Sequence, residues 1–134
     1  MNRGGDLKLL LDTHVLIWAI DNPNLLSRRV QKALLDGANE LHASVVSLWE
    51  IRLKVEAGKL AMPSDAGFLE DNFRKVGVKR YLPLELLHIH QLVKLPLIHK
   101  DPFDRILLAQ ALAEGWTLVS KDANLAKYPQ KVFW

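Results

Sequence analysis

Four acidic residues, each in a separate segment of the chain, have the side-chain types and positions for metal-dependent chemistry. They are Asp12, Glu50, Asp104 and Asp122. Carboxylates that cluster repel and raise one another's pKa, so such a group is stable as anions mainly when a divalent cation neutralises it. Because every ligand atom would be an oxygen, the set favours Mg²⁺ or Mn²⁺ over Zn²⁺.

Helix capping is the main alternative role for these aspartates, because Asp is a preferred N-cap residue. The segment that begins at Asp101 illustrates it. Asp101 suits the N-cap, Pro102 suits the first helical position, and Asp104 falls at the third, as in a capping box. The spacing alone leaves open whether Asp101 or Asp104 is the third acid of the cluster.

Glu50 is the hardest of the four acids to explain as a surface residue. It borders a helical stripe that we expect to face the core, formed by Val46, Trp49 and Leu53. A carboxylate beside that stripe would be costly to desolvate without a partner. The alternative to a catalytic role is an ion pair with Lys54, four residues further on.

The five histidines give a weaker metal signal than the acids. His88 and His90 are two residues apart in a predicted helix and point to different faces, so a zinc site is not expected there. His14 lies close to Asp12 in sequence and could assist chemistry, but packing at a helix start is the preferred interpretation. For His42 and His99 we expect surface or core packing.

The elements that must position the acids alternate along the chain. The pattern predicts strands over 7–11, 40–43, 78–82, 116–120 and 131–134, and helices over 13–20, 27–37, 44–58, 65–76, 84–93 and 101–115. Such alternation implies right-handed crossovers and a parallel sheet with helices on both faces, which is a three-layer α/β/α sandwich. Ligands bind such sheets beyond the carboxyl ends of the strands, where Asp12 and Asp122 both stand. Ser44 and Ser47 are alternative caps for the third helix, and the leucine-rich 82–97 run is expected in the core or at a dimer interface.

Composition restricts the class of protein. The 134 residues are 49% hydrophobic, so we expect one domain over residues 1–134. A formal net charge of +3 excludes a histone-like nucleic-acid binder, and the lack of Cys excludes disulfides, thiolate zinc sites and a cysteine nucleophile. The apolar runs are too short to span a membrane, and a soluble, cytoplasmic protein is expected.

Taken in order, the acidic motifs resemble those of a known family. They are Leu10-Leu11-Asp12-Thr13, Trp49-Glu50, the segment from Asp101 to Ala111, and Thr117-Leu118-Val119-Ser120-Lys121-Asp122. From about residue 7 to residue 134, the chain resembles PIN-domain proteins and, more narrowly, the VapC-type toxins of bacterial type II toxin–antitoxin pairs.

The resemblance implies a parallel five-stranded sheet and a Mg²⁺- or Mn²⁺-dependent endoribonuclease. By position, the catalytic residues would be Asp12, Glu50, Asp104 and Asp122, with Asp12 and Asp104 as the principal metal ligands. Asp104 is preferred over Asp101 because the family's acid directly precedes the apolar run that begins here at Ile106. The implied partners are an RNA substrate, a second copy of the chain and a small antitoxin that blocks the site.

Two further points bear on function. Lys100, Arg105 and Lys121 adjoin the acids in sequence and could offset their negative field and contact phosphates. The alternative function is a catalytically inactive PIN-like module that binds RNA or protein through the same fold.

Overall fold

The centre of the molecule is a parallel five-stranded sheet, as the sequence predicts. A computed structural model describes residues 7–63, 65–128 and 132–134. The strands are β1 (Lys8–Leu11), β2 (Glu40–Ser44), β3 (Val78–Leu82), β4 (Thr117–Val119) and β5 (Val132–Phe133). Their order across the sheet is β3-β2-β1-β4-β5, with β5 at an edge as expected. Lys131, where the last predicted strand begins, lies outside the described residues.

The winding direction reverses between β1 and β4. From β1 the chain moves outward through β2 to β3, and it then returns to place β4 on the other side of β1. Leu10 is paired in register with Leu118 of β4 and with His42 of β2. Because all pairings are parallel, the carboxyl ends of β1 and β4 meet at one edge, where such sheets bind ligands.

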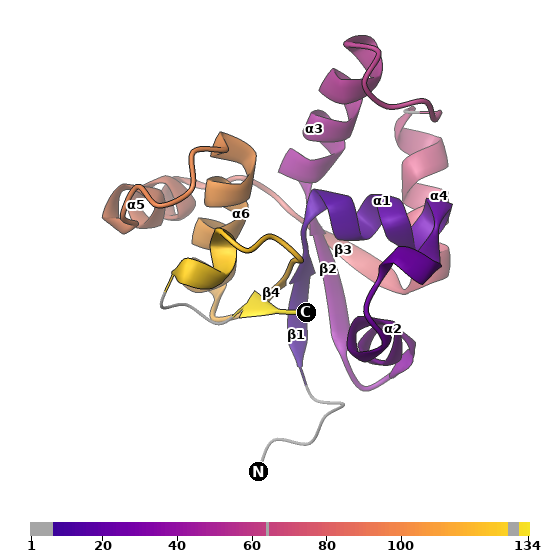
Figure 1. The fold of residues 1–134 in the computed structure, drawn as a ribbon, viewed down its shortest axis with the longest axis horizontal. Helices are drawn as coiled ribbons and strands as arrows, with labels where there is room; N and C mark the ends of the chain where they lie inside the picture. The colour runs from indigo at the N-terminus through magenta and orange to yellow at the C-terminus, as the bar shows by residue number, and fades with distance from the viewer. Residues whose placement is uncertain (1–6, 64, 129–131) are drawn as a thin grey trace.

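Helices cover both faces of the sheet. They are α1 (Thr13–Asp21), α2 (Arg28–Leu35), α3 (Val45–Glu56), α4 (Ala66–Val76), α5 (Leu86–Lys94) and α6 (Pro102–Glu114), with short 3-10 turns at Pro23–Leu25 and Leu125–Lys127. In Figure 1, α1, α2 and α4 lie on one side of the sheet and α5 and α6 on the other. This arrangement confirms the three-layer α/β/α prediction.

Side-chain alternation in β1 explains the two covered faces. Leu9 and Leu11 point into the core beneath α1, α2 and α4, whereas Leu10 points into a second core beneath α6. All three leucines are fully buried. A central parallel strand is therefore apolar at successive positions, which is the pattern that predicted it.

Side-chain caps fix where the helices begin. Asp12, Ser27, Asp65 and Asp101 accept hydrogen bonds from backbone N–H groups in the first turns of α1, α2, α4 and α6. Of the two candidate caps for α3, Ser44 is the one used, because its hydroxyl accepts from the Val46 N–H at 3.1 Å. None of the helices in the described ranges is long and apolar enough to cross a membrane.

The predicted inward stripe of α3 is right for Val46, which is buried, and wrong for Trp49 and Leu53. Trp49 and Leu53 are 59% and 38% exposed, whereas the buried side chains of the helix include Ser47, Glu50 and Ile51. The helix leaves the end of β2 and extends beyond the sheet (Figure 1), and Val55 in its last turn still packs against the core beneath α1, α2 and α4. Its buried side is therefore the one that faces the carboxyl ends of the strands, and Glu50 belongs to that side.

The leucine-rich run around α5 is core only in part: Leu82 and Leu95, which flank the helix, are buried, whereas most of the leucines on the helix are not. Leu86, Val93 and Leu97 are 70%, 79% and 75% exposed. The helix packs chiefly on α6 and buries His88, so most of its leucines face outward from the described part of the chain.

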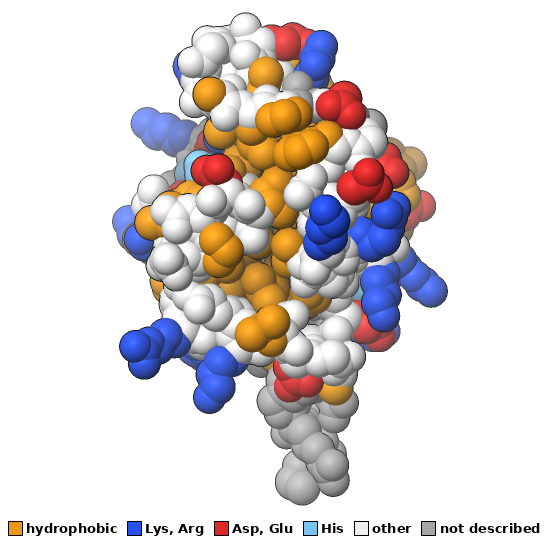
Figure 2. All heavy atoms as spheres, turned by 90° about the vertical axis from the view of Figure 1, so that its right-hand side faces the viewer, with side chains coloured by type: hydrophobic (Ala, Val, Ile, Leu, Met, Phe, Trp, Pro, Cys, Tyr) orange, Lys and Arg blue, Asp and Glu red, His pale blue; other side chains and the backbone are white. Residues whose placement is uncertain are grey.

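A second apolar region lies on the opposite side of the molecule. There, a hollow of about 230 Å³ is lined in part by Leu26, Leu34 and Val76, and hydrophobic side chains gather along this face in Figure 2.

Candidate active site

Asp12 lies at the carboxyl end of β1 and has two roles at once. Its backbone N–H donates to the Val119 carbonyl at 3.1 Å, which joins the ends of β1 and β4. Its Oδ1 accepts from the Val15 N–H at 2.9 Å and so caps α1. The side chain is only 3% exposed and lies close enough to Glu50 and Asp122 to interact with their charges. Capping and membership of the acidic cluster are therefore compatible.

Glu50 is held at both carboxylate oxygens. The Thr13 hydroxyl lies 2.6 Å from Oε1 and 2.9 Å from the Ser47 hydroxyl, while the Lys54 ammonium lies 3.0 Å from Oε2. The predicted i,i+4 pair with Lys54 is thus present, but it is not a surface pair, because Glu50 is only 3% exposed.

The structure separates the roles of Asp101 and Asp104. Asp101 caps α6, since its Oδ1 accepts from the N–H groups of Phe103 and Asp104 at 2.8 and 3.3 Å. Asp104 is 6% exposed, and its charge interacts with those of Asp12 and Glu50. Its carboxylate therefore belongs to the cluster.

His99 joins two of the acids, and the sequence prediction that it serves only packing is wrong. Its Nε2 lies 3.0 Å from Oδ2 of Asp104 and 3.0 Å from Oδ2 of Asp122. Its Nδ1 accepts from the Asp101 N–H at 3.1 Å, which places the ring proton on Nε2, facing the carboxylates. The backbone N–H of His99 donates to the Tyr128 hydroxyl at 2.9 Å.

Sequence reasoning missed His99 because one partner lies 23 positions away. A local signal was available, since a histidine two residues before an N-cap aspartate can accept from the backbone N–H of that aspartate. The other histidines take different roles. His42 stacks on Trp116 at 4.0 Å, His88 lies 2.9 Å from Glu114, and the exposed His14 lies 5.8 Å from the Trp18 ring.

Burial and mutual repulsion make two of the acids hard to ionise. Burial raises the pKa of Asp12 to about 6, with hydrogen bonds from Ser120 and Val15 opposing the rise and the charges of Glu50 and Asp122 adding to it. Burial likewise raises the pKa of Asp104 to about 7, with further contributions from the charges of Asp101 and Asp12. The contributions of the neighbouring acids have the sign expected from clustering, but burial is the larger cause of both pKa rises.

Asp122 departs from that expectation. Partial burial acts to raise the pKa of Asp122, but hydrogen bonds from His99 and from the Asn124 N–H outweigh it and hold the pKa below its usual value. The rise in pKa therefore applies to Asp12 and Asp104 and not to Asp122.

The side chains present suit a divalent cation. Ligand atoms of His99, Asp104 and Asp122 lie within 4.8 Å of one another, and Asp12 adds a buried carboxylate whose charge interacts with those of Asp104 and Asp122. Buried carboxylates with raised pKa values gain a counter-charge when a cation binds. The oxygen-rich donor set matches hard ions such as Mg²⁺ and Mn²⁺.

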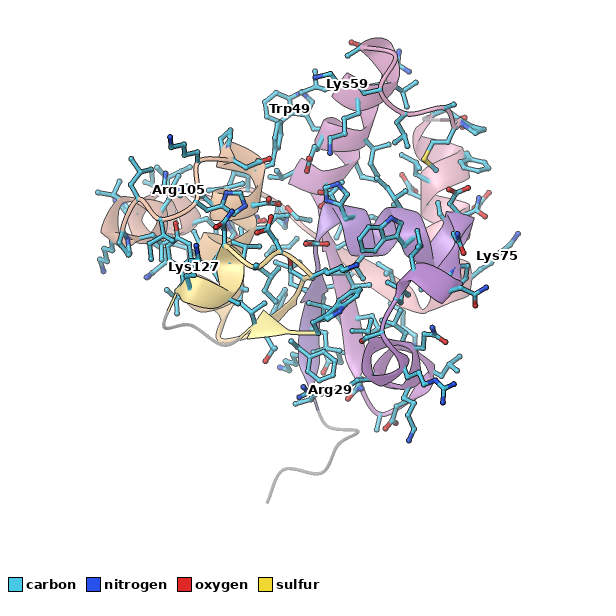
Figure 3. The ribbon with its side chains drawn as sticks, viewed as in Figure 1. Arg29, Trp49, Lys59, Lys75, Arg105 and Lys127 are labelled. Carbon is cyan, nitrogen blue, oxygen red and sulfur yellow. The ribbon has the colours of Figure 1, made fainter. Side chains whose placement is uncertain are left out.

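Two hollows flank the acids. One, of about 410 Å³, is lined by Asp12, His14, Trp18, Lys121, Asp122 and Ala123. The other, of about 350 Å³, is lined in part by Glu50, Lys54, Lys59 and Phe103. Figure 3 shows Trp49 on the side of α3 that faces α6, and its ring meets that of Phe103 edge to face at 5.2 Å. The acids are therefore reachable from solvent on two sides.

Comparison with known proteins relates this arrangement to one family. The PIN domain family model matches residues 9–131. Over 125 residues the chain is 32% identical to Ribonuclease VapC22 of Mycobacterium tuberculosis, and the match covers 90% of this chain and 91% of that protein.

Solved structures share the fold at lower identity. VapBC2 from Rickettsia felis, bound to a DNA fragment from its promoter, gives a TM-score of 0.72 at 16% identity, over 96% of this chain and 98% of that one. DNA-bound VapBC from Salmonella typhimurium gives a TM-score of 0.68 at 17% identity, and the match covers 96% of this chain and 97% of that one. Both likenesses concern the arrangement of the backbone.

Proposed function

The chain belongs to the PIN-domain family, and from this premise we propose that it is a metal-dependent endoribonuclease that hydrolyses RNA phosphodiester bonds as the toxin of a toxin–antitoxin pair. One observation carries the proposal. Four acids from four segments converge where β1 and β4 end, and two of them, Asp12 and Asp104, are buried with raised pKa values. The 32% identity to a protein named as a ribonuclease supports the same activity.

Asp12 and Asp104 are proposed as the principal ligands of Mg²⁺ or Mn²⁺, with Asp122 as a direct or water-mediated ligand. A bound divalent ion supplies neutralisation of the phosphate oxygens and an activated water. His99 orients the carboxylates of Asp104 and Asp122 through its Nε2. Such supporting hydrogen bonds fix the direction in which a ligand oxygen points.

Glu50 is proposed to orient the attacking water and accept its proton. A base in this role must be ionised and held in one position. The Thr13 hydroxyl and the Lys54 ammonium hold the Glu50 carboxylate in one position, because each contacts a different oxygen of it. The remaining lone pairs of these oxygens are available to a water.

The deciding experiment measures RNA cleavage by the purified protein with and without Mg²⁺. We expect cleavage that requires the ion and is lost in Asp12→Asn. Asp21→Asn is the matched control, because Asp21 is an exposed aspartate at the far end of the same helix. RNA binding by the wild-type protein without cleavage at any Mg²⁺ or Mn²⁺ concentration would instead indicate the inactive binding module.

The proposed partners are a small antitoxin and a second copy of the chain. The neighbours named as VapBC complexes support the antitoxin, and the outward-facing leucines around α5 offer apolar area for a homodimer. The proposed location is the cytoplasm, where RNA substrates are present. Sedimentation of the purified chain, compared with that of Val93→Asp, tests the dimer.

A further inference from the structure

The hollow beside Asp12 and Asp122 combines two kinds of lining. One kind is the carboxylates of Asp12 and Asp122, and the other is the side chains of His14, Trp18 and Lys121. His14 and Lys121 are exposed, and Trp18 is partly so. With a volume of about 410 Å³, the hollow can accept a planar ring next to the acids.

The aromatic side of this hollow is organised by ring contacts. The His14 and Trp18 rings lie 5.8 Å apart at an angle of 46°, and Trp18 meets Trp134 edge to face at 6.1 Å. The Lys121 ammonium lies over the Trp18 and Trp134 rings, 5.8 and 6.0 Å from their centroids. These distances are near the outer limit of a cation–π contact, so the ammonium is held near the rings while it stays exposed to solvent.

Aromatic faces with an adjacent exposed cation are the elements that bind single-stranded nucleic acid. Bases stack on aromatic side chains with little regard to sequence, and a lysine pairs with the adjoining phosphate. An uncharged base can also lie beside Asp12 and Asp122 without the repulsion that an anion would meet there.

We propose that His14, Trp18 and Lys121 form an aromatic subsite, which binds one unpaired nucleotide next to the phosphate that is cleaved. The base stacks against the His14 and Trp18 rings, and Lys121 pairs with a phosphate of the same strand. This inference rests on the proposed ribonuclease function. It adds that the RNA must be unpaired where it enters the hollow beside Asp12 and Asp122. A peptide segment of an antitoxin is the competing occupant.

Binding to three 12-nucleotide probes tests the subsite: oligouridylate, oligoadenylate and an abasic ribose-phosphate oligomer. The measurements use Asp104→Asn, in which cleavage is disabled, and add His14→Ala, Trp18→Phe, Trp18→Ala or Lys121→Ala to it. We expect Trp18→Ala to weaken binding of both base-bearing probes on the order of 10-fold and to leave the abasic probe unchanged, because only stacking is lost. His14→Ala should act in the same direction, and Trp18→Phe should retain most of the affinity.

Lys121→Ala should weaken binding of all three probes and reduce the slope of log affinity against log salt by about one. Lys75→Ala is the charge-matched control, because Lys75 is exposed on α4, well away from the acids (Figure 3). The exposed His14 and Lys121 keep the test decisive if Trp18→Ala does not fold.

Several outcomes would overturn the subsite. Unchanged affinity in both His14→Ala and Lys121→Ala would do so. An equal loss of affinity for the base-bearing and abasic probes in Trp18→Ala or His14→Ala would also overturn it. Loss of antitoxin binding with intact RNA binding would assign the hollow to the peptide. Failure of the proposed function gives a different result: the wild-type protein binds the probes, with the expected pattern in the variants, but cleaves no RNA in Mg²⁺ or Mn²⁺.

Discussion

The hydroxyl oxygen of Thr13 lies 2.6 Å from Oε1 of Glu50, and this contact joins the start of α1 to α3 across 37 positions of sequence. Lys54 holds the other oxygen of the same carboxylate at 3.0 Å. Glu50 is therefore both the ion-pair partner that helical spacing indicates and a fixed, buried carboxylate at the end of the sheet. Burial distinguishes it from an ordinary surface pair.

Replacement of Glu50 by Gln tests the proposed role of this carboxylate. We expect Glu50→Gln to stay folded and to lower turnover on the order of 10²-fold or more, because the amide cannot accept a proton from water. Single-turnover cleavage of RNA in Mg²⁺, without antitoxin, measures the effect.

The matched control for Glu50→Gln is Glu56→Gln on the same helix, since Glu56 forms an exposed pair with Arg52 at 2.8 Å. It should retain activity and cost only a few tenths of a kcal/mol. The catalytic role of Glu50 is falsified if both variants cleave at the wild-type rate.

Mn²⁺ should raise the melting temperature of the wild-type protein. An ion that binds only the native state stabilises it by mass action, by about 2.7 kcal/mol at a concentration one hundred times the dissociation constant. Asp104→Asn should abolish the rise, because it removes a proposed ligand. Asp71→Asn is the control, because Asp71 is an exposed residue that pairs with Arg74, and this variant should keep the rise in melting temperature. Differential scanning calorimetry with and without Mn²⁺ gives the answer, and an equal rise in Asp104→Asn would argue against this residue as a ligand.

Removal of the His99 side chain should destabilise the metal-free protein. The imidazole bonds to Asp104, to Asp122 and to the Asp101 N–H, and His99 is only 9% exposed. His99→Ala leaves these groups without that partner, at a cost of roughly 1–3 kcal/mol per buried unsatisfied group. Urea denaturation in the presence of a chelator measures the loss. An unchanged midpoint would mean that water replaces the ring at no cost.

The stability of the metal-free protein should fall as pH rises from about 4 to 7. Asp12 and Asp104 ordinarily titrate with a pKa of 3.8, and burial raises these pKa values to about 6 and about 7. Between pH 4 and 7 the native state therefore binds more protons than the unfolded state, so stability declines with increasing pH. Asp122 contributes to stability with the opposite pH dependence, because its pKa is lowered in the native state. The stability that its ionised form provides is lost only as the pH falls below the usual pKa of an aspartate.

Bound Mg²⁺ should weaken or reverse this pH dependence, since the ion binds ionised ligands. Melting temperatures measured across the pH range in chelator and in Mg²⁺ provide the comparison, and Asp104→Asn should flatten the curve in chelator. A metal-free melting temperature that rises steadily from about pH 4 to 7 would contradict the burial of these two acids.

Local signals account for the parts of the fold that the sequence predicts well. Three successive buried leucines mark β1 as a central parallel strand, and Asp101 followed by Pro102 marks the start of α6. Asp12 and Asp122 could be placed at one edge of the sheet because both follow predicted parallel strands. Each of these inferences depends on residues that are close together in the chain.

The mispredicted features depend on tertiary packing instead. Trp49 and Leu53 fit a helical stripe with the buried Val46, yet α3 extends beyond the end of the sheet and leaves both of them exposed. The leucines around α5 have the composition of a core, but that helix lies on the outside of α6. His99 acquires its role only when Asp122 is brought to it by the pairing of β4 with β1. No periodicity within a single segment contains this information.

Asp12→Asn and Asp122→Asn should change the stability of the metal-free protein in opposite directions. Mutual repulsion alone predicts that each substitution stabilises the protein, but the two carboxylates differ in their surroundings. Asp12 is buried with a raised pKa, and Asn can replace it as the N-cap of α1, so Asp12→Asn should raise the melting temperature by several degrees near pH 8. Asp122 accepts hydrogen bonds from His99 and the Asn124 N–H, and these bonds favour its ionised form. Asp122→Asn weakens both hydrogen bonds and should lower the melting temperature.

Thermal unfolding of the two variants in chelator at pH 8, with Asp21→Asn as the exposed control, measures both changes. A rise in both variants would mean that His99 does not stabilise the Asp122 carboxylate in solution, and a fall in both would contradict the raised pKa of Asp12.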